Sequence, residues 1–228
     1  MATIQRDLKY FGTACTIYDI FLRVLNWFVF LKVLRVIAIS EIPTKPALPP
    51  NFRFEHIPVG EVARLSQNPE YALHPRLLHE MARGNNTCFG IYDGRTLANY
   101  MFVFVTPALM TDELEVAFGP RYAYLCAAFT HPRYRGLHVN SLGVDLGVRE
   151  YLTRGFREIL AYVESNNFSS LKSFARCGWR TVGTVHILRL FGRYIIHNGR
   201  GCSAYAFRVL PITTGLYVES ASRGANSN

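Results

Sequence analysis

The sequence is short of acidic side chains, of paired cysteines and of long apolar runs, and each shortage excludes a class of protein. Asp and Glu number 16 against 25 Lys and Arg, a formal charge of +9, which favours an anionic partner: nucleic acid, an acidic membrane surface or a phosphorylated small molecule. The five cysteines are odd in number, widely spaced and without a CxxC pair. We therefore expect free thiols in a reducing compartment and no metal site.

No apolar run is long enough to span a membrane. The uncharged runs 10–18 and 24–31 fall far short of the roughly 20 residues that a spanning helix requires. Asp19, Arg23 and Lys32 also interrupt the apolar core that a secretory signal would need. We expect neither a signal peptide nor a transmembrane helix, and a cytoplasmic protein.

The apolar segment 16–39 does not fit one straight helix. At about 100° per residue, Asp19 and Arg23 fall on one side, whereas Lys32 and Arg35 fall on nearly the opposite side. The pattern predicts a helix that ends near residue 30, followed by a short helix or a strand through residues 35–40.

We expect the N-terminal segment to be a helical extension that packs on the main domain or on another chain. Basic residues near Trp27, Phe28 and Phe30 also suit shallow docking on an anionic membrane. Peripheral membrane contact and oligomer contact through residues 16–39 both remain open at this point.

A proline-rich stretch divides the chain. Residues 41–50, EIPTKPALPP, hold four prolines and cannot form a helix or a central strand. We assign residues 1–50 to an extension with a linker, residues 51–212 to one domain, and residues 213–228, which have almost no apolar content, to a mobile tail.

Half of all residues are hydrophobic, enough for one large folded domain. Residues 87–105 predict two strands joined at Asp93-Gly94, and residues 188–197 predict a strand pair with a turn at Gly192 rather than a nucleic-acid platform. Other strands are expected at 52–57, 122–130, 159–163, 181–190 and 204–210, and helices at 59–67, 75–83, 139–152 and 169–176. The order predicts a mixed α/β fold with one central, mainly antiparallel sheet flanked by helices.

The stretch AFTHPRYRGLHVNSLGV, residues 128–144, predicts a strand, a turn and the start of a helix. Unpaired amides at a helix N-terminus attract anions. Arg133 and Arg135 add full charges there, and Gly136 permits close approach of a ligand to the backbone. A pyrophosphate fits this description, although a solvated turn that needs Gly136 only for its backbone angles is the simpler alternative.

A second stretch, VESNNFSSLKSFARCGW, residues 163–179, begins at the end of another strand. Asn166 or Asn167 can cap the helix that follows, and Gly178 stands where the helix is expected to end. Considered alone, capping explains the asparagines better than ligand binding does.

Taken together, the two stretches resemble the GNAT N-acetyltransferase superfamily. The family's acetyl-CoA signature, approximately V-x-P-x-x-R-G-x-G-x-G/A, is matched at Thr130, Pro132, Arg135 and Gly136. Its later signature, N-x-x-A/S-x-x-x-Y-x-x-x-G-F, is matched at Asn167, Ser170, Gly178 and Trp179. The resemblance covers about residues 52–210, and it implies the GNAT fold and acetyl-CoA as cosubstrate.

The resemblance also implies roles for individual residues. The backbone from Arg135 to Asn140 would hold the pyrophosphate of CoA, and amides near Phe129 and Thr130 would pair with the pantetheine arm and polarise the thioester carbonyl. Asn167 would contact the pantetheine or order the strand end. The implied cofactor-binding set is Phe129, Thr130, Arg133, Arg135, Gly136, Leu137, His138, Val139, Asn140, Asn167 and Lys172, with Arg176 as an alternative to Lys172.

This chain departs from the family pattern at three positions. His138 replaces the second glycine and Asn140 replaces the Gly/Ala, which makes the phosphate loop bulkier. Phe174 replaces the tyrosine that often donates a proton to the leaving thiolate. A thiol with a pKa of about 8.5 is nevertheless a tolerable leaving group without an acid.

The general base is not evident from the sequence. Many members of the family carry a glutamate near the start of the strand before the phosphate loop, and this chain has Tyr122 there. Glu115 and His131 are the nearby alternatives, followed by Glu113 and His138.

We therefore predict an acyl-CoA-dependent N-acyltransferase that moves an acetyl or related group to the amine of a small molecule by direct attack, with no nucleic-acid partner. No Cys-His arrangement indicates a covalent route. Two alternatives stay open: a GNAT-like CoA-binding or scaffold protein without catalysis, and a membrane-surface acyltransferase.

Overall fold

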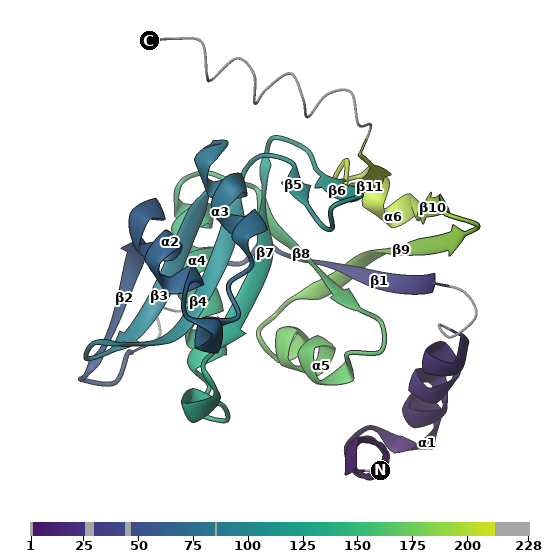
Figure 1. Ribbon diagram of the computed structural model, residues 1–228, viewed down its shortest axis with the longest axis horizontal. Coiled ribbons are helices and arrows are strands. Elements are labelled where there is room, and N and C mark those ends of the chain that lie inside the picture. The colour runs from purple at the N-terminus through teal and green to yellow at the C-terminus, as the bar shows by residue number, and fades with distance from the viewer. Residues whose placement is uncertain (1, 26–29, 44–46, 85, 213–228) are drawn as a thin grey trace.

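The computed structural model describes residues 2–25, 30–43, 47–84 and 86–212 (Figure 1). The main strands are β1 (Phe30–Ile39), β2 (Phe52–Ile57), β3 (Thr87–Asp93), β4 (Thr96–Phe104), β7 (Tyr122–Thr130), β8 (Glu158–Glu164), β9 (Arg180–Leu190) and β10 (Arg193–Asn198). Three short strands are β5 (Ala108–Leu109), β6 (Leu114–Ala117) and β11 (Arg208–Pro211). The helices are α1 (Ala2–Leu25), α2 (Val59–Ser66), α3 (Pro75–Ala82), α4 (Val139–Thr153), α5 (Phe168–Arg176) and α6 (Arg200–Ser203), with short 3-10 turns η1 (Pro69–Tyr71) and η2 (Pro132–Tyr134).

The main strands form a sheet of order β10-β9-β1-β8-β7-β4-β3-β2. Neighbouring strands are antiparallel except β7 and β8, which are parallel. A small sheet of order β11-β6-β5 lies beside it. The predicted mixed α/β fold with a mainly antiparallel central sheet and an N-terminal helix is confirmed.

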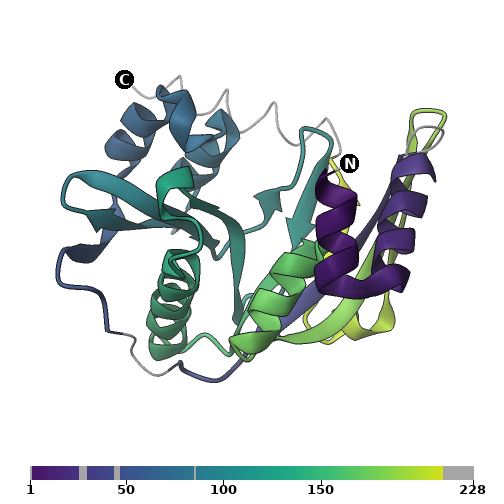
Figure 2. The same cartoon turned by 90° about the horizontal axis from the view of Figure 1, so that it is seen from below.

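Helices cover both faces of the sheet (Figure 2). Val62 of α2 and Leu77 and Met81 of α3 belong to the core on one face, whereas Val144 and Val148 of α4 belong to the core on the other. Each helix places apolar residues three or four positions apart toward the sheet, as amphipathic helices do. Two separate cores therefore sandwich the strands.

The predicted hairpin is confirmed as β3 and β4, with one small shift. Asp93 pairs with Thr96, so the two turn residues are Gly94 and Arg95 rather than Asp93 and Gly94. Gly94 has a φ of 56°, a backbone conformation that glycine adopts without steric cost. The strand pair at 188–197 is likewise confirmed as β9 and β10.

The prediction for the N-terminal fifty residues needs correction. Residues 30–39 are not part of an extension, because β1 lies inside the sheet between β9 and β8. Helix α1 is described as far as Leu25, and Phe30 is already the first residue of β1. Strand β1 is buried on both faces over its second half, and such a strand is a continuous apolar run that periodicity cannot distinguish from a buried helix.

Other differences are smaller. The strand expected at 204–210 is the shorter β11, because Ala206 with a φ of 49° ends the turn after α6. The short strands β5 and β6 were not predicted. Trp27, Phe28, the linker residues 44–46 and the tail 213–228 lie outside the described residues. Over the part of the chain that is described, no helix combines the length and the apolarity needed to cross a bilayer.

Candidate functional site

Strands β7 and β8 separate after a short parallel contact. They pair only from Tyr122 with Glu158 to Tyr124 with Leu160, and beyond this point they diverge (Figure 1). Strand β7 continues to pair with β4 on its other side as far as Thr130. Its edge toward β8 is therefore open from residue 125 onward, with backbone groups that have no neighbouring strand to bind.

A bulge lies at the point where the two strands separate. Ala127 pairs with Phe102 and Leu125 pairs with Val103, so Cys126 is the extra residue on β7. A bulge bends its strand and takes the extra residue out of the ladder. The backbone of β7 thus changes direction at the apex of the gap.

The gap holds a cavity of about 270 Å³. One wall is the β7 segment 125–128 and the other is the β8 segment 161–164, with Asn140 of α4 and Phe174 of α5 at the opening. Alanine stands at positions 127, 128 and 161, and these small side chains leave room between the strands. The cavity is a channel whose walls carry unpaired strand edges.

The loop that follows β7 leads directly into α4. Turn η2 is capped by His131, whose Nδ1 accepts a hydrogen bond from the backbone N–H of Arg133 (3.3 Å). Gly136 has a φ of 83° and His138 a φ of 58°. The first intrahelical bond of α4 runs from Leu142 N–H to the His138 carbonyl (3.1 Å), so the amides before Leu142 precede the helical bonding pattern.

The two left-handed residues explain why glycine recurs in such a loop. A positive φ is easy for glycine and unfavourable for a residue with a side chain. His138 occupies such a position while remaining exposed. The loop therefore keeps the left-handed backbone conformation that glycine adopts easily, although His138 stands at one of the two positions.

The Asn99 side chain forms hydrogen bonds both with the end of β7 and with the start of α4. This side chain is fully buried, and the two N–H groups of Nδ2 are shared among three acceptors: the Phe129 carbonyl (2.6 Å), Thr130 Oγ1 (3.2 Å) and Asn140 Oδ1 (3.2 Å). Three acceptors thus converge on one amide group. A buried polar side chain with several partners fixes the local structure strongly.

Helix α5 forms the other side of the opening. Asn167 Oδ1 accepts hydrogen bonds from Ser170 N–H (3.2 Å) and Ser169 Oγ (3.0 Å), which is the N-cap arrangement. Asn167 also lines the cavity between β7 and β8. Capping and cavity lining are therefore both properties of this asparagine.

A second cavity of about 160 Å³ lies between α4 and α5. Asn140, Ser170 and Phe174 line both cavities, so the two adjoin at these residues, and together they are called the cleft. An extended ligand with an anionic end fits this form.

The sequence of this region was compared with known protein families. A family model for the acetyltransferase (GNAT) family matches residues 57–179, more than half of the 228 residues. The chain belongs to the GNAT family. The match includes β7, the loop, α4 and α5, and it supports acyl transfer as the general chemistry.

Solved structures agree with this assignment. A Drosophila protein from a structural genomics consortium matches with a TM-score of 0.52 and 14% identity over 72% of this chain and 52% of its own length. A GCN5-related N-acetyltransferase from Sphaerobacter thermophilus matches with a TM-score of 0.52 and 12% identity over 78% and 55%. This GNAT chain thus spans just over half of each structure, and the likeness concerns the fold. Among curated proteins, no sequence matches the chain.

Of the residues implied for CoA, Asn140 and Asn167 line the described cavities, and the others stay a prediction. The loop from Arg135 to His138 is exposed beside the start of α4, and Arg135 Nε donates to the Thr130 carbonyl (3.4 Å). Val139 is buried with its side chain in the core, so only its backbone can face a ligand. Leu137 is exposed by 60%.

Two parts of the implied set need correction. The β7 residues that line the cavity are 125–128, not Phe129 and Thr130, because the strands already diverge at Leu125 and the Phe129 carbonyl is bound to Asn99. Lys172 and Arg176 are exposed on α5 and are not among the residues that line either cavity.

The candidate bases lie apart from the bulge. Tyr122 is buried, and its hydroxyl donates to the Ala204 carbonyl (3.2 Å). Glu115 lies on β6, opposite Leu210 of β11. His131 caps η2 and is buried. None of these three lines the described cavities.

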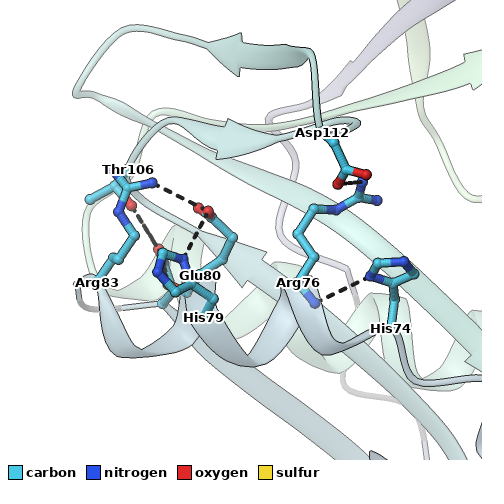
Figure 3. Close-up of polar contacts among 8 residues, drawn as sticks. His74, Arg76, His79, Glu80, Arg83, Thr106 and Asp112 are labelled. Atoms are coloured by element: carbon cyan, nitrogen blue, oxygen red, sulfur yellow. Dashed lines mark hydrogen bonds and ion pairs between the residues drawn. The ribbon is translucent and has the colours of Figure 1, made fainter. Parts of the chain in front are cut away.

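Sequence reasoning missed two charged residues of α3 that face the same side of the sheet as the Cys126 thiol. Figure 3 shows Arg76 and Glu80 extending from α3 toward the segment with Thr106 and Asp112. Glu80 is fully buried, with Oε1 3.3 Å from Arg83 Nη1 and with no hydrogen bond to Oε2 from any of the residues that the structure describes. Only the spacing i, i+4 on an otherwise apolar face could have marked the pair in the sequence.

The charges of Arg76 and Glu80 influence the pKa of the Cys126 thiol at the bulge. Burial raises the pKa of the Cys126 thiol to about 12, while Arg76 lowers it and Glu80 raises it. Burial likewise raises the pKa of Tyr162, which lines the same cavity, to about 12. Both groups are neutral near pH 7, and the charges of α3 act at the apex of the gap.

Proposed function

We propose that this GNAT protein is an acyl-CoA-dependent N-acyltransferase that transfers an acetyl group to the amine of a small molecule. The observation that supports this most is the cleft itself. It runs from the Cys126 bulge, between diverging strands, to the N-terminus of α4. Its apolar walls suit a pantetheine arm, and its amide-rich end suits a pyrophosphate.

The backbone supplies most of the binding groups in this proposal. The loop backbone of residues 135–140 would hold the pyrophosphate, although the Arg135 and Leu137 amides already donate to the Pro132 and Tyr134 carbonyls, and Arg133 and Arg135 would add charge-assisted hydrogen bonds. An unpaired amide at the bulge would donate to the carbonyl oxygen of the thioester. Fixed donors of this kind stabilise the charge that develops on that oxygen during acyl transfer.

Direct attack by the amine is favoured over a covalent route. A nucleophilic cysteine acts as a thiolate, whereas burial keeps Cys126 protonated at neutral pH. The amine nitrogen would form the new C–N bond as the C–S bond breaks. The proton released by the nitrogen passes to a base, and the CoA sulfur leaves as a thiolate.

The thiolate would leave without a strong acid. Phe174 has no proton to donate, and Tyr162 with a pKa of about 12 would transfer its proton unfavourably to a thiolate whose conjugate thiol has a pKa of about 8.5. The Tyr162 hydroxyl would instead serve as a hydrogen-bond donor. We expect the rate to depend little on any acid of this chain.

We infer that the amine approaches from the α3 side and that Glu80 accepts its proton through water, because the buried Glu80 side chain does not itself line the described cavities. Glu80 lies on that side, it raises the pKa of Cys126, and its Oε2 has no hydrogen-bond partner among the described residues. Glu80→Gln keeps the shape and removes the base. It should lower kcat by about 100-fold with an unchanged affinity for CoA, and Glu115→Gln is the matched control.

Isothermal titration with CoA, followed by a thiol-release assay with acetyl-CoA and a broad panel of amines, tests the proposal. Arg135→Ala should weaken CoA binding by about tenfold. Arg157→Ala, an exposed arginine at the other end of the β7 and β8 pair, should not. Absence of CoA binding at millimolar concentration would refute the proposal.

A CoA-binding protein without catalysis is the second candidate. It is favoured by Phe174 at the usual acid position and by the Tyr122 hydroxyl being bound to Ala204. It predicts normal CoA binding with no thiol release for any amine in the panel. Thiol release that depends on both an amine and Glu80 would exclude it.

A further inference from the structure

The second half of α1 reverses the usual pattern of a surface helix, because polar side chains lie on its buried face and apolar side chains face solvent. Thr16, Asp19 and Leu22 are buried, and Asp19 Oδ1 accepts a hydrogen bond from Asn166 Nδ2 (3.0 Å). The outward stripe is apolar instead. Ile17 is exposed by 66% and Phe21 by 58%, although apolar side chains normally form the inner face.

This outward stripe is continuous over two turns of the helix. Its members are spaced three or four positions apart and point in one direction. They are Ile17, Ile20, Phe21 and Val24. Contiguous exposed apolar surface of this kind marks a contact with a partner or a membrane.

The tip of the β9–β10 hairpin carries a second apolar group. Phe191 is exposed by 96%, and Leu190 and Ile195 are also exposed. Arg189 and Arg193 flank the tip in the sequence. An aromatic residue at the end of a hairpin between two arginines suits the boundary between lipid headgroups and acyl chains.

Phe30 connects the two groups. It lines a cavity together with Leu22 of α1, and its ring lies edge to face with Tyr194 of β10 at 6.5 Å. Figures 1 and 2 place α1 and the hairpin at the same end of the molecule. We call the residues Ile17, Ile20, Phe21, Val24, Phe30, Leu190, Phe191 and Ile195 the apolar patch.

The strands at this end carry charge of one sign. Strands β1, β9 and β10 contain five Lys or Arg and no Asp or Glu. Lys32, Arg189 and Arg193 lie at the patch end, whereas Arg180 pairs with Ala38 at the other end of β1. Lys32 and Arg189 are paired with Glu164 and Glu113, and the exposed Arg193 adds a further cation at the hairpin tip.

We propose that the apolar patch docks on an anionic membrane surface. The apolar side chains would enter the headgroup boundary, and the cations would contact acidic lipids, each worth a few-fold in affinity near the surface. A second copy of this chain suits the patch less well. A symmetric contact brings the same surface of both copies together, so two patches with cations of the same sign would face each other.

Vesicle co-sedimentation with the full chain tests this, using phosphatidylcholine vesicles and vesicles with one third phosphatidylserine. The wild type should bind the anionic vesicles at least tenfold more tightly, and the difference should shrink as salt is raised. Phe191→Asn, Phe191→Asp and Phe21→Asp should each weaken binding by about tenfold or more. Asn and Asp tolerate the φ of 49° at position 191.

Ile42→Asp is the matched control, because Ile42 is exposed by 51% beyond the opposite end of β1. It should bind vesicles as the wild type does. Equal binding of neutral and anionic vesicles, or equal effects of Ile42→Asp and Phe191→Asp, would overturn the proposal. A dimer in light scattering that Phe21→Asp dissociates, without vesicle binding by the wild type, would assign the patch to a second copy instead.

Discussion

Replacing Asn99 should both destabilise the fold and loosen the CoA cleft. In Asn99→Ala the Phe129 carbonyl loses a donor at 2.6 Å, and two further acceptors lose one at 3.2 Å. A buried group left without its partner costs about 1–3 kcal/mol. Together with the small cavity that the truncation leaves, we expect a loss of about 2–4 kcal/mol in the free energy of unfolding.

Asn99→Asp provides the sharper comparison. It is nearly isosteric, but it replaces the donor by a carboxylate that faces three acceptors in a fully buried place. A buried charge without a donor is more costly than a missing hydrogen bond. Asn99→Asp should therefore be less stable than Asn99→Ala, although it is closer in shape to the native residue.

Thermal and urea unfolding measure the stability, and isothermal titration calorimetry measures the affinity for CoA. For a chain of this size, about 2–4 kcal/mol corresponds to a fall in Tm of roughly 5–15 °C. Asn51→Ala, at an exposed asparagine, should change the stability by less than about 0.5 kcal/mol. A loss below about 0.5 kcal/mol for Asn99→Ala, or equal stability of the Ala and Asp variants, would refute the reasoning.

Three further predictions concern backbone strain, packing and protonation. His138→Gly should stabilise the fold by about 0.5–1 kcal/mol and Gly136→Ala should destabilise it by about 1 kcal/mol, since both positions have positive φ; chemical unfolding checks the signs, and equal signs would contradict the argument. Gly143→Ala should lower Tm and weaken CoA binding. A Cβ at position 143 would lie 2.4 Å from Met101 Cε and push α4 away from the sheet. An unchanged Tm would show that α4 is loosely packed. Burial raises the pKa of Cys126 to about 12, so the unfolded chain loses this proton at a lower pH than the folded chain does. The free energy of unfolding should therefore fall as pH rises from about 9. In urea unfolding between pH 8 and 10, Cys126→Ala should reduce the number of protons released on unfolding by about one.

The sequence predicted those parts of the fold whose signals are local. Strand β7, α4 and α5 follow from apolar runs, proline and glycine positions and a capping asparagine. The loop before α4 followed from Pro132, Arg135 and Gly136. The structure then showed why His138 can replace a glycine there: the residue adopts the same left-handed backbone and directs its side chain to solvent.

The parts that were missed depend on contacts between distant segments. Strand β1 is an apolar run whose partners, β8 and β9, lie more than a hundred residues away, and no local pattern distinguishes it from a buried helix. The bulge at Cys126 is a property of the register with β4, which a single strand does not encode visibly. The sequence therefore pointed to Phe129 and Thr130, whereas the cavity is lined by residues 125–128 of β7.

The candidate site divides in the same way. The proposed phosphate end, from Arg135 to Asn140, is one continuous segment, so its motif was visible in the sequence. The proposed reacting end would combine groups of β7 and β8, which line the cavity, with charges of α3, which influence the pKa of Cys126. Glu80 and Arg76 look like ordinary charges of a surface helix until α3 is packed on the sheet and Glu80 is buried.

By itself, the sequence determined that this protein is an α/β domain with a strand-to-helix loop that carries two arginines and a glycine, and with a capped helix after the next parallel strand. These features are set by residues close together in the chain. Only the tertiary structure decided where β1 belongs, where β7 leaves β8, which polar side chains are buried without partners, and that α1 turns an apolar stripe outward. Burial and pairing between distant segments fix these properties, because a polar side chain costs little free energy in water but needs a hydrogen-bond partner once it is buried.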